Sequence, residues 1–125
     1  MATVRMVFGK TLEVRVSLRS ATPSVEALLE AIPFKSSIHR WGDEVYFDAP
    51  FHCDIEADAR ARMEVGDVAF WPNGDAIAVF FGPTPASVDE QPMAYSPCNI
   101  LGRVDGPAER LKSVGEGARV EILSV

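Results

Sequence analysis

One short stretch of the sequence combines an arginine with acidic and phenolic side chains. A guanidinium presents several N–H donors in a fixed fork, which suits a carboxylate, a carbonyl or a phosphate. In an extended strand, alternation would place Glu44, Tyr46 and Asp48 on one face, close to Arg40. The stretch therefore predicts either a polar cleft or an ordinary solvated strand face, in which Arg40 pairs with Asp43 or Glu44.

His52-Cys53-Asp54 is the pattern in the chain that most resembles a metal site. Neighbouring strand residues point to opposite faces, so at most His52 and Asp54 converge. Two ligands make a poor site, and His39 would have to complete it through the tertiary fold. We expect no functional metal and no cofactor.

Nucleophilic catalysis has little support in the sequence. The chain has two histidines and no Gly-x-Ser-x-Gly turn. Cys53 and Cys98 lie in neither a CxxC pair nor a zinc-ligand spacing, so we expect buried reduced thiols, with a disulfide as the alternative. Trp41 and Trp71 are interpreted as packing residues rather than as the walls of a ligand box.

Alternation of apolar and polar residues indicates the elements that position these groups. The predicted strands are residues 2–8, 12–18, 37–40, 44–47, 51–55, 68–71, 76–81, 99–104 and 118–125. Helices are predicted at 22–32, where Thr22-Pro23 supplies an N-cap, and at 107–114. Asn73-Gly74 favours a type I′ hairpin turn, and the proline-rich residues 82–98 favour a long surface loop without strands.

Many short strands and two short helices predict a mainly β fold, a closed eight-stranded antiparallel barrel in a single domain over residues 1–125, with a β-sandwich as the alternative. Apolar residues make up 47% of the chain and charged residues 24%, which is typical of a globular protein. The helix at 22–32 is expected to cover one open end.

The charge balance argues against two classes of binding partner. Twelve basic and eighteen acidic side chains give a formal net charge of −6, which repels nucleic acid and anionic membrane surfaces. No apolar run is long enough for a signal peptide or a membrane span, so we expect a cytoplasmic protein. The oligomeric state is left open.

Four motifs occur in order along the chain. They are Trp41-Gly42-x-Glu44-Val45-Tyr46-Phe47, Gly66-Asp67-Val68, Trp71-Pro72-x-Gly74 and Phe80-Phe81-Gly82-Pro83-Thr84-Pro85. With Ile38-His39-Arg40 and Ile100-Leu101-Gly102-Arg103-Val104, they resemble the small prokaryotic cyclophilin-like proteins of uncharacterised function. The resemblance runs over nearly the whole chain, and it implies an eight-stranded barrel with a pocket on one outer face.

The resemblance does not extend to the full catalytic set of prolyl isomerases. Cyclophilin enzymes follow their arginine with Phe-Met-x-Gln-Gly-Gly-Asp, whereas this chain has Val45-Tyr46-Phe47-Asp48 and no glutamine there. Residues 86–99 also lack the tryptophan and the histidine that the enzymes carry before their Phe-Gly-x-Val strand. Arg40 and Phe81 are the matches to catalytic positions, which implies that isomerase activity is absent or weak.

The outer-face pocket is predicted where the strand after Arg40 returns beside it and where the central hairpin opens into the proline-rich loop. The candidate ligand-binding residues are Arg40, Tyr46, Asp48, Phe81, Thr84 and Asn99. The function expected is binding of a peptide or a small polar molecule. The alternatives are a weak peptidyl-prolyl isomerase that uses Arg40 and a small-molecule metabolic enzyme.

Overall fold

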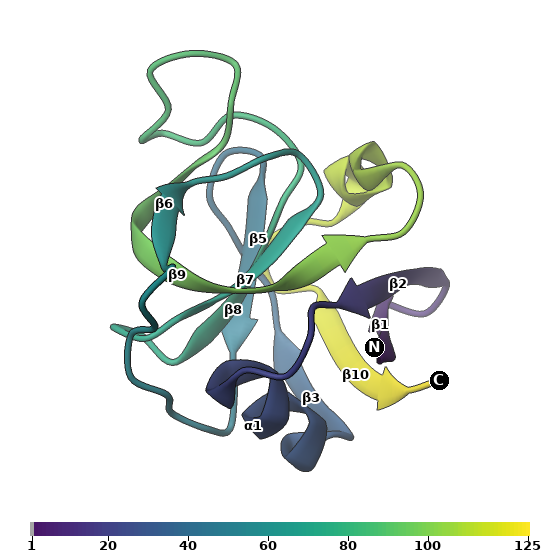
Figure 1. The fold of residues 1–125 in the computed structure, drawn as a ribbon. Helices are drawn as coiled ribbons and strands as arrows, with labels where there is room; N and C mark the ends of the chain where they lie inside the picture. The colour runs from purple at the N-terminus through teal and green to yellow at the C-terminus, as the bar shows by residue number, and fades with distance from the viewer. Residues whose placement is uncertain (1) are drawn as a thin grey trace.

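Strands dominate the computed structural model, which describes residues 2–125 (Figure 1). The strands are β1 (Thr3–Phe8), β2 (Leu12–Leu18), β3 (Phe34–Ser37), β4 (His39–Arg40), β5 (Glu44–Asp48), β6 (Arg60–Arg62), β7 (Asp67–Trp71), β8 (Ala76–Phe80), β9 (Met93–Val104) and β10 (Arg119–Ser124). An α-helix, α1 (Pro23–Ala31), and a 3₁₀ helix, η1 (Ala108–Ser113), complete the chain. Within residues 2–125, no helix is long and apolar enough to cross a membrane.

The strands form one strongly curved antiparallel sheet. Its order is β3, β10, β1, β2, β9, β7, β8, β5 and β4, and β6 pairs with the first half of β9. The prediction of a mainly β antiparallel fold is confirmed. The prediction of a closed eight-stranded barrel is wrong, because the sheet has ten strands and is not closed.

The opening lies between β3 and β4, the two ends of the sheet, which Ile38 alone separates along the chain. The backbone N–H of Ile38 donates to the carbonyl of Ala118, and its carbonyl accepts from the N–H of Gly117. Both polar groups of Ile38 are therefore used on the β10 side. The covalent chain, rather than a row of hydrogen bonds, links the two edges there.

A large apolar core fills the inside of the curved sheet. Alternate residues of most strands enter it, and from α1 the buried Val25 and Leu28 join them. Thr22 caps α1 by accepting a hydrogen bond from the Val25 N–H, as the sequence predicts, and Pro23 begins the helix. The helix lies across the lower end of the sheet in Figure 1.

The hairpin between β7 and β8 is confirmed, but its turn is not type I′. The turn holds four residues, 72–75, between the paired residues Trp71 and Ala76. Positive φ occurs at Asp75 (49°) and not at Gly74. Pro72 explains the difference, because its fixed φ suits the first central position of a turn closed by the Gly74 N–H and the Trp71 carbonyl.

Two further segments differ from the prediction. Residues 51–55 form no strand: Phe51 stacks on Phe70 with ring centroids 4.9 Å apart, so the segment packs through side chains instead of backbone pairing. Residues 82–98 are not all loop, because β9 begins at Met93 and pairs with β6. Pro97 lies within β9, where an irregular stretch of pairing tolerates its missing N–H.

Candidate ligand-binding pocket

The outer face of strands β5, β7 and β8 holds the site. Alternation along β5 follows the prediction: Val45 and Phe47 are fully buried in the core, whereas Glu44 and Tyr46 face the other way. The outer face is not simply solvated. Residues from β6 and the first half of β9 cover part of it, and they form a second, smaller apolar cluster with Ala69 and Phe80.

Small side chains leave a hollow in this outer face. Ala78 on β8 lies opposite both Tyr46 and Ala69 on the neighbouring strands, and Ala76 lies two residues away on the same face. The hollow is a cavity of about 170 Å³, and a cavity of roughly 150 Å³ is large enough for benzene. It is lined by Trp41, Glu44, Tyr46, Trp71, Ala76, Ala78, Ala94, Tyr95 and Cys98.

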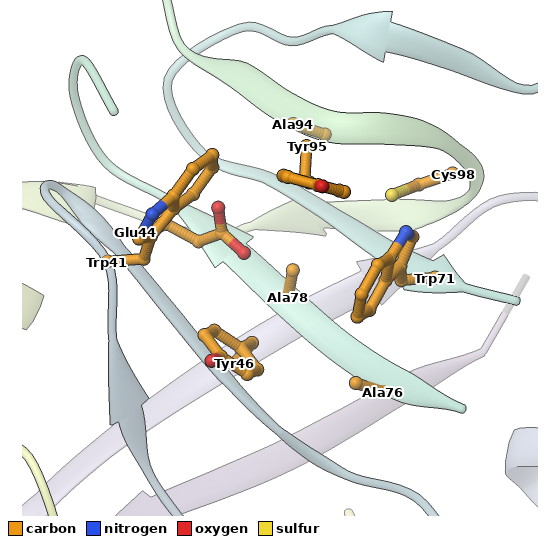
Figure 2. A pocket seen from close by; sticks show the side chains of 9 residues that line it. All are labelled: Trp41, Glu44, Tyr46, Trp71, Ala76, Ala78, Ala94, Tyr95 and Cys98. Atoms are coloured by element: carbon orange, nitrogen blue, oxygen red, sulfur yellow. The ribbon is translucent and has the colours of Figure 1, made fainter. Parts of the chain in front are cut away.

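Three aromatic side chains from three different elements form the walls (Figure 2). Trp41, from the turn between β4 and β5, meets Tyr95 of β9 edge to face, with ring centroids 6.2 Å apart. Trp71 meets the same Tyr95 from the other side at 6.0 Å, again edge to face. The Trp71 Nε1–H donates to Ser96 Oγ at 2.6 Å, which fixes that ring. The Trp71 wall is therefore held in place before any ligand binds, and Tyr95, which is 76% exposed, contacts both tryptophan rings.

Glu44 places a carboxyl group between these walls. Figure 2 shows it beside Trp41, directed toward Ala78 and Tyr95. The residue is only 7% exposed, and Oε1 is buried with no hydrogen-bond partner among residues 2–125. Burial raises the pKa of Glu44 to about 8. At neutral pH the empty pocket therefore favours the protonated, uncharged acid.

Cys98 contributes a thiol on the β9 side of the pocket. Burial, and then the nearby carboxyl of Glu44, raise the pKa of this thiol to about 12, and its Sγ–H donates to the Ser96 carbonyl at 3.3 Å. A neutral thiol is a poor nucleophile. Cys53 and Cys98 are both free, as predicted, with Cys98 buried and Cys53 half-buried.

The structure brings Arg40 and Phe81 together, but away from the cavity lining. The Arg40 guanidinium lies 4.9 Å from the centre of the Phe81 ring. Its Nη1 donates to the carbonyls of Lys112 and Val114, and its Nε to the carbonyl of Gly42. An ion pair of 3.3 Å joins Nη2 to Asp43. Arg40 thus ties η1 to the turn that carries Trp41.

The other predicted site residues lie in separate places. Tyr46 lines the cavity, and Asp48 is exposed near the end of β5. Thr84 is buried, and its hydroxyl donates to the Met93 carbonyl. Asn99 is fully buried, and its side-chain amide donates to Ser24 Oγ and accepts from the Glu56 N–H.

The exposed His52 lies between two carboxylates rather than in a metal centre. Its Nε2 is 3.2 Å from Asp54, and its Nδ1 is 2.5 Å from Asp75. Hydrogen bonds first to Asp75 and then to Asp54 raise the pKa of His52. Within residues 2–125, no three His, Cys, Asp or Glu side chains are grouped to hold a metal.

Sequence reasoning missed most of the cavity lining. The sequence favours packing roles for Trp41 and Trp71, and Tyr95 lies in the segment predicted as loop. One signal was available: two of the three outward positions of β8 are Ala76 and Ala78, the third is Phe80, and Ile77 and Val79 point inward. Small residues at outward positions on a central strand indicate a hollow or a close neighbour. The sequence does not say which.

The comparisons with known proteins agree with this architecture. The family model described as Cyclophilin-like matches residues 2–123. A hypothetical protein from Archaeoglobus fulgidus, known from a solution structure, is similar over 99% of this chain and 95% of its own. The two share 35% sequence identity, and the TM-score is 0.84. No curated protein sequence matches the chain. By its sequence and its fold, the chain belongs to the cyclophilin-like family.

Proposed function

We propose that this chain is a binding domain that holds a small organic molecule, or one side chain of a peptide, in the outer pocket. The observation that carries the proposal is the set of aromatic walls around a buried carboxyl group that has an unpartnered oxygen. Ligand sites are typically concave, mostly apolar and supplied with a few polar groups that orient the ligand. This pocket has those properties, and Tyr46 is the predicted site residue that belongs to it.

Preorganisation supports binding in this pocket. The hydrogen bond from Trp71 to Ser96 sets the position of that wall in advance, and Tyr95 contacts both tryptophan rings edge to face. A ligand then orders few side chains when it enters, so less of its interaction energy is lost as conformational entropy. Of the other predicted residues, Arg40 and Phe81 support the turn that carries Trp41.

Efficient prolyl isomerase activity is not part of the proposal. Such an enzyme stabilises a twisted amide with free, preorganised donors. Three backbone carbonyls and Asp43 already occupy the donors of Arg40, and the glutamine of the isomerase pattern is absent. We expect the isomerisation rate of a proline-containing model peptide to equal that in buffer. A rate comparable to that of cyclophilin enzymes would refute this part of the proposal.

A small-molecule enzyme is the second candidate, and the raised pKa of Glu44 favours it. A carboxyl group with a pKa of about 8 in a cavity is a suitable general acid near neutral pH. The candidate predicts that a bound molecule is chemically altered by the native chain and unaltered by Glu44→Gln. Mass spectrometry of the molecule before and after incubation measures this.

The binding proposal is tested with benzyl alcohol, a neutral probe of suitable size. We expect it to shift the indole N–H signals of Trp41 and Trp71 in two-dimensional NMR spectra. Ala78→Leu fills the floor of the cavity and should abolish the shifts. Val88→Ala, on an exposed residue outside the lining, is the matched control and should leave them unchanged. Absence of shifts in the native chain, or equal shifts in Ala78→Leu, would refute the proposal.

A further inference from the structure

We propose that the group bound in the pocket is an organic ammonium ion, held by the carboxylate of Glu44 and by the faces of Trp41, Trp71 and Tyr95. This inference rests on the proposed binding function and names the chemical class of the ligand. Four properties of the pocket carry it: its charge, its aromatic walls, its size and the titration of Glu44.

The charge of the lining favours a cation. Glu44 is the acidic residue among the nine that line the cavity, and none of the nine is Lys, Arg or His. Oε1 is buried without a hydrogen-bond partner among residues 2–125. A buried carboxylate is stable only when it is paired, and an ammonium group supplies both the charge and, where it carries N–H, the hydrogen bond. An anionic ligand would be repelled by the same carboxylate.

The aromatic walls favour a cation with an apolar surface. The face of an indole or phenol ring attracts positive charge, and cages of such rings bind quaternary ammonium groups. Trp41 and Trp71 stand on opposite sides of the cavity, and Tyr95 lies across the space between them (Figure 2). The plane of the Tyr95 ring makes an angle of 66° with that of Trp41 and 79° with that of Trp71. The three rings therefore enclose a space on different sides instead of stacking on one another.

The size of the cavity selects an organic ion over a metal ion. A cavity of about 170 Å³ accepts a group the size of a trimethylammonium head. A hard metal cation such as Ca²⁺ requires about six or more oxygen ligands. The lining offers one carboxylate, the hydroxyls of Tyr46 and Tyr95, and otherwise carbon, two indole N–H groups and a thiol. Such a lining cannot replace the hydration shell of a metal ion.

The titration of Glu44 couples binding to pH. The titratable groups that share the lining are Tyr46 on its own strand and Tyr95 and Cys98 on β9; the residues from β7, β8 and the Trp41 turn bring none. Burial favours the neutral acid when the pocket is empty, and a bound cation favours the carboxylate. Binding of a cation therefore releases a proton from Glu44. The affinity for a permanently charged cation rises with pH and levels off above about 8.

The experiment compares two probes of the same shape. Choline carries a trimethylammonium group, and 3,3-dimethylbutan-1-ol has carbon in place of the charged nitrogen. Their affinities are measured at pH 8 by NMR titration of the Trp41 and Trp71 indole signals. Three proteins are used: the native chain, Glu44→Gln and the control Glu109→Gln, which alters an exposed residue of η1. Thermal melting checks that each variant is folded.

We expect the native chain and Glu109→Gln to bind choline at least about tenfold more tightly than the neutral alcohol. The reason is that the Glu44 carboxylate and the aromatic faces attract the ammonium charge and have no such attraction for the alcohol. Glu44→Gln should lose this preference. A native affinity for choline that rises from pH 6 to pH 8, with a flat profile for the alcohol, supports the inference without any substitution.

Equal affinities of the native chain for the two probes would overturn the ammonium assignment and leave the binding pocket standing. The same holds if Glu44→Gln keeps the preference for choline. If neither probe, nor benzyl alcohol, shifts the indole signals, the binding function itself fails. A short peptide that carries trimethyl-lysine separates the two sources of the ion: tighter binding than choline indicates a peptide side chain, and weaker binding indicates a free small molecule.

Discussion

The two faces of the same three strands differ in what they do. On the inner face, β5, β7 and β8 contribute large apolar side chains to the main core: Val45, Phe47, Val68, Phe70, Ile77 and Val79. On the outer face, most of the alternate residues of these strands are small, polar or amphipathic, namely Glu44, Tyr46, Ala69, Trp71, Ala76 and Ala78, and the exception is Phe80, which is buried in the second apolar cluster. The inward-facing residues of each strand hold the fold together, and the outward-facing residues shape the pocket.

This division means that the pocket can vary while the fold is retained. Close packing on the inner face leaves no space for a change of volume. The cavity on the outer face accepts such changes, because it contains unfilled space. A matched pair of substitutions on adjacent residues of one strand tests the difference, since both residues then share the same backbone.

Phe47→Ala and Tyr46→Ala form this pair and should show the largest contrast. Phe47 is fully buried in the main core, and removal of such a ring lowers the free energy of unfolding by about 3–5 kcal/mol. Tyr46 is half-buried at the cavity, so its removal should cost about 1 kcal/mol. Urea unfolding measures both values. Similar losses would contradict the division between the two faces.

Ala69→Leu and Ala78→Leu compare filled and unfilled space on the outer face itself. Ala69 is fully buried and does not line the cavity, so a larger side chain should cost about 1–3 kcal/mol through overpacking. Ala78 forms the cavity floor, where the added carbons enter free space, and stability should change by less than about 1 kcal/mol. Thermal unfolding of the two variants side by side decides whether the hollow exists in solution.

Glu44→Gln should change the pH dependence of stability. The pKa of Glu44 is near 4.5 when unfolded and about 8 when folded, so between these values the folded state binds one more proton. Its contribution to stability is complete below pH 4.5 and declines as pH rises toward 8, by up to about 1.4 kcal/mol per pH unit. Glutamine does not titrate, so this decline should be missing from the variant. Unfolding measured at pH 5, 6, 7 and 8 gives both slopes, and parallel slopes would contradict the raised pKa.

Gly74→Val should lower the free energy of unfolding by about 1 kcal/mol or more. A Cβ atom at Gly74 would overlap the ring of Trp71, so the wall of the pocket would have to move. Gly74→Ala and Gly115→Ala are a matched comparison, because a Cβ at Gly115 meets nothing within 4 Å. We expect only the change at Gly74 to lower the melting temperature and to shift the Trp71 indole signal. An unchanged signal would show that the ring does not rest on Gly74.

The sequence by itself determined the local elements and which residues of a strand face the core. Thr22-Pro23 marked the start of α1, the alternation in residues 44–48 placed Val45 and Phe47 in the core, and the apolar runs on either side of residues 72–75 marked the hairpin. These features depend on neighbours within a few residues, and their periodicity is visible in the chain. The four ordered motifs likewise pointed to the family that the comparisons show.

Only the tertiary structure decided how these elements combine. The open edge between β3 and β4 depends on Ile38 bonding to residues 117 and 118, which lie at the far end of the chain. The pocket unites Trp41, Trp71 and Tyr95, and no local pattern relates residues so distant in sequence. The sequence left open whether Arg40 lines a cleft or pairs with Asp43 or Glu44; the structure pairs it with Asp43, and the carbonyls of Lys112 and Val114 accept from its Nη1. The environment of Glu44 also depends on the tertiary structure. A carboxylate on an alternating strand is solvated by default, but the segment of β9 that covers the pocket buries Glu44 and so raises its pKa.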